Sequence, residues 1–532
     1  MSLMAGEIPT LEVRRMSIQD IERQRPDQAQ PAATGLRGRW WALAALVLSG
    51  LVIGLDTTVL ITALPTLSAR LGATTTDLQW ISAAYTLALG GLLLVGGVLG
   101  DRYGRKRLLL LGLGIFGISS VVASQVTTAA ELIGMRAIMG IGASLILPLS
   151  LSILPSMFSE EERPRAVGAG AAGAFLGLPL GPLVAGYLLT HYAWGTIFLI
   201  NAPVVVIALI GVTLFVPEGR DPQPKPLDVV GALLSVAGVT ALVYGVIEQP
   251  LHGWGDLRVL GAIVGGVVIL LAFVAWDLRH PTPFVDMGLF LDRRFTWATV
   301  AFVATGFALF GVMFILTPYL QIVQGSDAQA TGLKLLPLIG GVIVGAGAGN
   351  QLAARLGARV GIPTGMIVST VGLGALAQAG AETTYGTVAI GLAVVGLGLG
   401  IGLPTALDVI LGSAPPAQTG TAAALSRMLQ QVAASFGVAL LGSILTTGYQ
   451  ASLSAHLGGL PSAIRNAAEG SLAGAAAVAA HLPASLGGAL KHAADQAYAA
   501  GMDQVMLVSA AIMLGGAIAI AIWMPRAGTR AG

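Results

Sequence analysis

Cysteine is absent from this chain of 532 residues, and charged side chains are scarce. The absence of cysteine excludes disulfides, iron–sulfur clusters and cysteine zinc sites. The six histidines show no metal-ligand spacing, so we expect no metal site. A net charge of only +2 provides no broad basic surface for nucleic acid. Only 10% of the residues are charged, against about 25% in a soluble domain, so the chain cannot cover a water-facing surface.

Apolar residues make up 55% of the chain, and the mean hydropathy is +0.82. This excess must face lipid, which predicts an all-α integral membrane protein with many spans. Fourteen apolar segments are each long enough to cross a hydrocarbon core of about 30 Å. They are 42–66, 77–100, 107–126, 130–154, 165–188, 195–216, 228–248, 259–277, 297–319, 332–352, 362–380, 386–411, 421–447 and 502–524.

The distribution of basic residues predicts the orientation of these segments. An even number of spans puts both termini on one side of the membrane. With residues 1–39 inside, most of the 28 lysines and arginines fall in cytoplasmic segments, as the positive-inside rule requires. The first apolar run begins late, at Trp40, and is too long for a signal peptide. We therefore expect a multi-pass protein with both termini in the cytoplasm.

Two further features concern the second half of the chain. The Ala-rich stretch 448–501 lies outside in this topology, and both short surface helices and a mobile loop remain open for it. The residues Leu99, Arg102 and Gly104 recur at an offset of 253 as Leu352, Arg355 and Gly357. Internal duplication of this kind is typical of transporters built from two related halves.

Charges inside a membrane are costly and therefore informative. Asp56 lies roughly 15 Å from the outer end of the first segment, and Arg136 roughly 10 Å from the outer end of the fourth. A low dielectric favours the neutral form of a carboxylic acid, and a nearby guanidinium favours the charged form. Moving the arginine would thus promote proton uptake, although a fixed structural ion pair remains the alternative. Asp408 and Arg427 could form a second pair.

A basic, glycine-rich loop joins the second and third segments. Glycine permits a tight turn, an aspartate can accept hydrogen bonds from a helix N-terminus, and the cationic side chains anchor the loop at the inner surface. By physical chemistry alone it could be only a loop that sets the topology. The residues concerned are Gly97, Asp101, Arg102, Gly104, Arg105 and Lys106.

The fifth segment combines small residues with prolines. Small residues four positions apart let helix backbones approach closely, and proline permits a bend. The bend could be a hinge or a static kink. The residues concerned are Gly177, Gly181, Pro182 and Gly186.

Together these motifs resemble the major facilitator superfamily, and specifically its fourteen-helix drug:proton antiporters. Residues 55–65 resemble the first-helix signature, and residues 97–107 resemble the cytoplasmic loop motif. Residues 136–143 are similar to the fourth-helix motif linked to proton coupling. Residues 177–186 resemble the fifth-helix antiporter motif, and residues 194–203 look like the sixth helix.

The resemblance implies two six-helix bundles in a pseudo-twofold arrangement, with two extra helices between them, in a bacterial cytoplasmic membrane. The implied parts are a cytoplasmic tail (1–39), a first bundle (40–216), two linker helices (228–277) and a second bundle (297–524) that contains the extracytoplasmic loop 448–501. The family usually works as monomers, with membrane lipid around them.

The implied activity is alternating access, with proton uptake driving export of amphipathic, often cationic, small molecules. No cofactor is expected, because the proton gradient supplies the energy. Two departures stand out. Segment 421–447 contains no acidic residue and offers Arg427, Gln430 and Gln431 instead, and Ala354 stands where the first copy of the loop motif has Asp101.

A substrate pocket is expected near the midplane, between the bundles. The candidate contacts, chosen for aromatic stacking or polarity, are Tyr85, Phe175, Asn201, Phe307, Met313, Phe314, Tyr319 and Gln430. An exporter of lipids or lipid-like metabolites is the alternative on the same scaffold, and a membrane receptor is a more distant one. An enzyme is not expected, because no clustered nucleophile, metal ligands or paired carboxylates are found.

Overall fold

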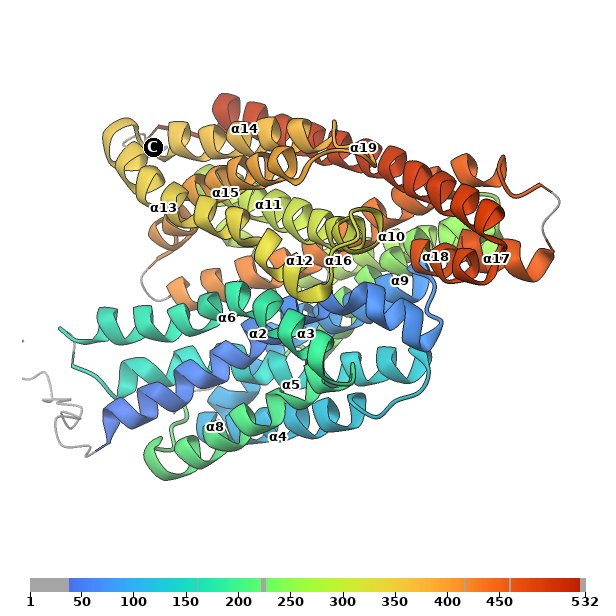
Figure 1. Ribbon diagram of the computed structural model, residues 1–532. Helices are drawn as coiled ribbons and strands as arrows, with labels where there is room; N and C mark the ends of the chain where they lie inside the picture. Colours follow the sequence, from blue (N-terminus) through green and yellow to red (C-terminus); the bar gives the residue numbers. More distant parts are fainter. Residues whose placement is uncertain (1–37, 160, 222–225, 416–417, 459–460, 527–532) are drawn as a thin grey trace, which may run out of the picture.

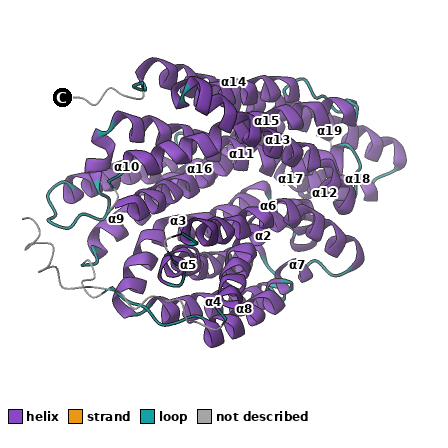
Figure 2. Cartoon of the chain, turned by 90° about the vertical axis from the view of Figure 1, so that its left-hand side faces the viewer, coloured by secondary structure: helices purple, strands orange, loops and turns teal. Residues whose placement is uncertain are grey.

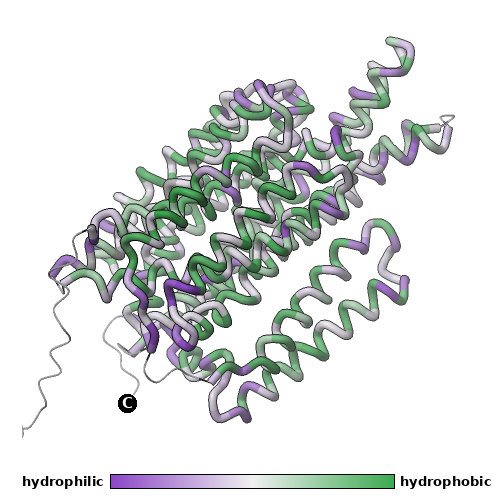
Figure 3. Tube along the Cα trace, turned by 90° about the horizontal axis from the view of Figure 1, so that it is seen from below, coloured by the Kyte–Doolittle hydropathy of each residue, from purple (hydrophilic) through white to green (hydrophobic). Residues whose placement is uncertain are grey.

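The computed structural model describes residues 38–159, 161–221, 226–415, 418–458 and 461–526, which form helices and connecting loops with no strand among them (Figure 2). The expected N-terminal tail, 1–39, lies almost wholly outside the described residues. Hydrophobic residues dominate the long helices, and hydrophilic residues gather near their ends (Figure 3).

Within the described residues, thirteen helices are long and apolar enough to cross a membrane. A further helix, α6 (Arg163–His191), has 29 residues, and several of its side chains lie outside the described set. With α6, the long helices match the fourteen expected segments. In the first half they are α2 (Arg39–Leu71), α3 (Thr75–Tyr103), α4 (Arg105–Ala123), α5 (Ala129–Ile153), α6 and α8 (Asn201–Phe215). Next come α9 (Val229–His252) and α10 (Leu257–Asp277). The second half has α11 (Arg293–Pro318), α13 (Leu336–Leu356), α14 (Ala358–Leu376), α15 (Tyr385–Ser413), α16 (Thr419–Ser454) and α19 (Ala484–Trp523).

The helices pack into two bundles, and the two extra helices, α9 and α10, form a hairpin beside them. In the first bundle α2 packs on α6 and α8, and α5 packs on α3 and α4. In the second, α15 packs on α13 and α14, and α11 packs on α16. In the hairpin, α9 contacts α3 of the first bundle and α16 of the second. The two extra helices therefore lie beside the contact between α3 and α16. The all-α membrane architecture expected from the sequence is confirmed.

The two bundles contact each other from the middle of α3 and α16, where the hydroxyl oxygens of Thr86 and Ser435 lie 2.6 Å apart, to one end of the molecule. We call the end that holds Arg39 and Trp523 the terminal end and the opposite one the cap end (Figure 1). At the cap end, the short helix α12 (Ala328–Lys334) packs on α6. There Nε2 of Gln321 donates to the carbonyl of Thr62 at 2.7 Å. The printed hydrogen bonds and ion pairs near the terminal end, such as Arg39 with Glu162, join parts of one bundle.

Residues 448–501 are mostly helical where the structure describes them, which favours short helices over an irregular loop for this stretch. The helix α16 continues to Ser454, and α19 already begins at Ala484. Between them lie α17 (Ser462–Gly470) and α18 (Leu472–His481). Pro461 and Pro483 stand just before α17 and α19, where a missing N–H costs nothing.

The internal repeat has a structural counterpart. Gly104 separates α3 from α4 with φ of +113°, and Gly357 separates α13 from α14 with φ of +81°. Positive φ strains residues with a side chain, so glycine lets each chain turn directly from one helix into the next.

Candidate functional site

A buried ion pair joins α2 and α5 inside the first bundle. Nη1 of Arg136 donates to Oδ2 of Asp56 at 2.6 Å, and the two side chains are only 1% and 2% exposed. Nε of Arg136 donates to the carbonyl of Ile81 at 3.3 Å, and Cζ lies 4.1 Å from the ring centroid of Tyr85. Buried charges are tolerated only when they are paired and hydrogen-bonded, and this pair meets both conditions.

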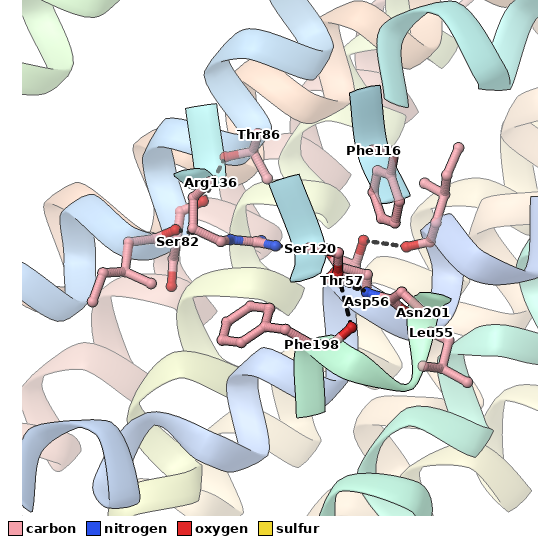
Figure 4. A network of polar contacts seen from close by, with 12 residues as sticks. Leu55, Asp56, Thr57, Ser82, Thr86, Phe116, Ser120, Arg136, Phe198 and Asn201 are labelled. Atoms are coloured by element: carbon pink, nitrogen blue, oxygen red, sulfur yellow. Dashed lines mark hydrogen bonds and ion pairs between the residues drawn. The ribbon is translucent and has the colours of Figure 1, made fainter. Parts of the chain in front are cut away.

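Asn201 binds the second oxygen of the same carboxylate. Its Nδ2 donates to Oδ1 of Asp56 at 3.1 Å and to Oγ of Ser120 at 2.9 Å. The Ser120 hydroxyl in turn donates to the carbonyl of Phe198 at 2.9 Å. Figure 4 shows this network. We expected Asn201 to contact substrate, but the structure places it against the ion pair and not in the lining of the central cavity. Ser120 was not anticipated.

A central cavity lies beside the ion pair, between the two bundles. Of the predicted substrate contacts, Tyr85 lines it from α3 and Phe314 lines it from α11. Phe310, one helical turn before Phe314, was missed by the sequence analysis although the spacing of four places both on one helix face. The complete lining is Thr57, Leu60, Ile61, Ser82, Tyr85, Thr86, Arg136, Phe310, Phe314, Ala434 and Val438.

Three other predicted contacts lie elsewhere, and the side chain of Phe175 lies outside the described residues. Met313 lines a separate apolar cavity inside the second bundle. The Tyr319 hydroxyl is committed to the carbonyl of Gly380 at 2.8 Å. The backbone of Phe307 packs against α16, where its carbonyl meets Gly437. None of these three residues lines the central cavity.

Gln430, the last predicted contact, is buried on α16 beside Arg427. Nη1 of Arg427 donates to Oε1 of Gln430 at 3.2 Å, and the guanidinium lies 5.6 Å from the ring centroid of Phe302. Asp408 is exposed on α15, and the ion pairs of the described residues do not join it to Arg427. The predicted second pair is thus not formed in this structure.

The loop between α3 and α4 is held to the first bundle. Nε of Arg105 pairs with Oδ1 of Asp101 at 2.8 Å, and Nη1 of Arg105 donates to the carbonyl of Ser152 at 3.1 Å. Arg102 lies over the ring of Tyr103. The hydrogen bond to Ser152 links the loop to the end of α5.

Glu218, in the segment after α8, is a further partner of this loop that sequence reasoning missed. Its carboxylate accepts from the backbone N–H of Lys106 at 3.1 Å and lies 3.5 Å from Nε of Arg107. A Cβ at Gly104 would lie 2.8 Å from Oε1 of Glu218, but this flexible carboxylate can move aside, so glycine is needed there for its positive φ. At Gly97, by contrast, a Cβ would meet only ordinary contacts.

The glycines of α6 allow two close helix contacts. A Cβ at Gly177 would lie 2.7 Å from a backbone atom of α2, and one at Gly181 would lie 3.0 Å from another. A Cβ at Gly186 would lie 2.6 Å from Cα of Gln329 in α12, and the carbonyl of Pro182 also faces α12. The same motif thus packs α6 against the helix that carries the ion-paired aspartate and against the second half.

The chain belongs to the major facilitator superfamily, because the model of the Major Facilitator Superfamily matches residues 46–438. It is similar to the multidrug efflux pump LfrA of Mycolicibacterium smegmatis, with 33% identity over 93% of this chain and 98% of that protein. It is also similar to the tetracenomycin C resistance and export protein of Streptomyces glaucescens, with 31% identity over 91% of this chain and 92% of that one. The family and these relatives point to a transporter rather than an enzyme, in a multi-pass membrane protein.

Solved structures support the same fold. A bacterial homologue of the human lysosomal transporter Spinster, in an inward-facing and occupied conformation, matches with a TM-score of 0.63 and 16% identity, over 91% of this chain and 97% of that one. A D-xylose–proton symporter matches with a TM-score of 0.59 and 14% identity, over 92% and 98%. At such identities the likeness concerns the fold alone.

Proposed function

We propose that this protein is a proton-coupled antiporter that exports amphipathic small molecules, drugs among them, by alternating access. The observation that carries the proposal is the buried pair of Asp56 and Arg136 beside the central cavity. The names of the relatives, a multidrug efflux pump and a resistance and export protein, favour export.

The ion pair provides a route from proton binding to rearrangement. Protonation of Asp56 removes the negative charge that holds Arg136, while the hydrogen bond from Asn201 keeps the carboxyl group in place. A guanidinium freed in this way must find other acceptors, because an unpaired buried charge is strongly unfavourable. Release of the proton restores the attraction. This cycle requires no cofactor.

We place the protein in a bacterial cytoplasmic membrane as a monomer, with both termini in the cytoplasm, on the basis of the positive-inside distribution of lysine and arginine. The terminal end then faces the cytoplasm and the cap end faces outward. Because the contacts between the bundles gather toward the cap end, the structure corresponds to a state closed to the outside.

The test uses purified protein in liposomes with an imposed pH gradient, a fluorescent amphipathic dye and a lumenal pH indicator. We expect Asp56→Asn to abolish both dye movement and dye-dependent proton flux while the protein still inserts and folds. Asp277→Asn is a matched control, because Asp277 is also 2% exposed but lies on α10, outside both bundles. Normal gradient-driven transport by Asp56→Asn would refute the coupling role, and transport of labelled lipid instead of dye would favour the lipid alternative.

A further inference from the structure

Asp503 is an isolated carboxylate in the described part of the second bundle. It lies on α19, its side chain is half-buried, and its Oδ1 atom is buried without a hydrogen bond among the described residues. None of the ion pairs of the described residues includes it. A buried acceptor without a donor is unfavourable, and more so when it carries a charge. The carboxylate therefore needs a ligand that supplies a positive charge or a donor.

Asp503 lies at the cap end, level with Tyr319. The helices α11 and α19 pack together, and Trp297 stacks on Trp523 at the terminal end with ring centroids 5.3 Å apart. Asp503 is about 30 Å along α19 from Trp523, and Tyr319 is about 33 Å along α11 from Trp297. A hydrocarbon core is about 30 Å thick, so both residues lie at its far boundary. The Asp503 carboxylate is within electrostatic range of the Tyr319 hydroxyl.

The polar groups around Tyr319 have too few donors. The Tyr319 hydroxyl donates to the carbonyl of Gly380 at 2.8 Å. Nε2 of Gln324 donates to the Tyr319 hydroxyl at 3.2 Å and to the carbonyl of Thr383 at 3.0 Å. These donors are used, yet Oε1 of Gln324 and Oδ1 of Asp503 are both buried without a partner in the described part of the chain. A proton on the Asp503 carboxyl group would convert an acceptor into a donor.

The turn that holds Tyr319 also contacts the first bundle. Residues Tyr319–Val323 form a π-helical turn, η3, and α19 packs against it. Such turns are rare and are frequent at functional sites. Within η3, Nε2 of Gln321 donates to the carbonyl of Thr62 on α2 at 2.7 Å. A change in the packing of α19 on η3 would therefore reach the contact that joins the two bundles at the cap end.

No cation on the neighbouring elements compensates Asp503 within the described ranges. The helix α19 packs on α11, α14, α16, α18 and η3. Besides Tyr319, the charged or titratable side chains of these elements are Arg293, Arg294, Arg359, Arg427, Tyr449 and His481. The arginines lie within the first three turns of their helices, toward the terminal end, and His481 is exposed. On α19 itself, Lys491 is paired with Asp495 at 2.6 Å.

We propose that Asp503 is a second proton-binding site, which takes its proton from the outer side and, when occupied, stabilises the closed cap end. The neutral carboxyl group stays buried beside Tyr319, which keeps Gln321 of η3 on Thr62. Loss of the proton leaves an unpaired charge, and opening of the cap end to water relieves it. This site rests on the proton-coupled function and the orientation proposed above, and it extends the coupling from Asp56 in the first bundle to the second.

Infrared difference spectroscopy between alkaline and weakly acidic pH detects the bound proton directly. Purified protein in lipid nanodiscs is used, without substrate. A protonated carboxyl group gives a C=O band that a carboxylate lacks, and we expect one such band to disappear in Asp503→Asn and to remain in Asp56→Asn. Asp256→Asn is the matched control, because Asp256 caps α10 and accepts from the backbone N–H of Arg258 at 2.7 Å. A full set of bands in Asp503→Asn would overturn the proposal.

Closure is measured by the reaction of a membrane-impermeant maleimide with Ser68→Cys in liposomes, because Ser68 is buried at the cap end. The rate is divided by that of Ser454→Cys, which is exposed, so that the effect of pH on the thiol cancels. With native Asp503 we expect the corrected rate to rise about tenfold from weakly acidic to alkaline pH, as for an unpaired buried charge. Asp503→Asn should remove this rise, and Asp503→Glu should restore it.

A corrected rate that does not depend on pH with native Asp503, or that still rises in Asp503→Asn, would refute the proposed site. Sodium ions that slow the reaction at constant pH would also refute it, because the site would then bind small cations in general. Neither measurement uses a transported substrate or a gradient, so a failure of drug export or of coupling at Asp56 leaves both results unaffected.

Discussion

A single methyl group at Gly177 tests how closely α2 and α6 must pack. A Cβ at this position would lie 2.7 Å from the carbonyl carbon of Gly54 and 2.7 Å from the carbonyl oxygen of Leu51. Favourable contacts between carbon atoms are about 3.5–4.0 Å, so the two helices would have to separate by about 1 Å. The obstructing atoms belong to the backbone, and no change of rotamer can relieve the clash.

We expect Gly177→Ala to lower the free energy of unfolding by about 1–3 kcal/mol, the usual cost of overpacking a well-packed interior. The displaced stretch of α2 includes Asp56, two residues beyond Gly54, so the ion pair with Arg136 should also be disturbed. The variant should therefore melt at a lower temperature in detergent and lose gradient-driven dye transport in liposomes.

Gly168→Ala provides the control on the same helix. A Cβ at Gly168 would meet no atom within 4 Å, and alanine favours a helix over glycine by up to about 1 kcal/mol. This variant should be as stable as the wild type or slightly more so. Equal melting temperatures and transport rates for Gly177→Ala and Gly168→Ala would refute the packing argument.

Three other changes have definite expected outcomes. Asn201→Ala removes a hydrogen bond to the Asp56 carboxylate and should lower the free energy of unfolding by about 1.5–3 kcal/mol; a wild-type melting curve would contradict this. Glu218→Gln removes an ion pair whose arginine is 79% exposed, so thermal unfolding should show a loss below about 1 kcal/mol. The hydroxyls of Ser68 and Ser471 lie 3.1 Å apart at the cap end. Because the chain has no cysteine, a Ser68→Cys/Ser471→Cys double variant can form one disulfide at this position. Oxidation should stop transport, and reduction should restore it. Transport by fully cross-linked protein would disprove that the contact between Ser68 and Ser471 must open during transport.

The ion pair could be predicted from the sequence because charges are so rare in the apolar segments. Asp56 and Arg136 stand out on composition alone, and their depths suggested that they could meet. Asn201 carries no charge, and its role depends on how α8 packs beside α4, which brings it to Ser120, 81 positions earlier in the chain. Such a partnership is set by tertiary packing, and local sequence does not reveal it.

The substrate contacts were harder to predict for a different reason. A membrane helix is apolar toward lipid as well as toward its neighbours, so hydrophobic periodicity does not show which face points inward. Aromatic residues such as Tyr319 and Phe314 look equivalent in sequence, yet one binds a backbone carbonyl within the second bundle and the other lines the central cavity. The extent of α16 and α19 was underestimated because their outer turns are helical without being continuously apolar.

The buried ion pair and the cavity wall opposite it belong to different bundles. Asp56, Arg136 and Asn201 all lie in the first bundle, and their hydrogen bonds stay within it. The second bundle covers the cavity with Phe314 and Val438, which form no polar bond to the ion pair. A shift of the second bundle would therefore uncover Tyr85 and Arg136 without first breaking the bond between Arg136 and Asp56. In the proposed cycle, protonation of Asp56 releases the arginine, and rearrangement of the bundles follows, because the side chain of Arg136 lines the cavity that the second bundle covers.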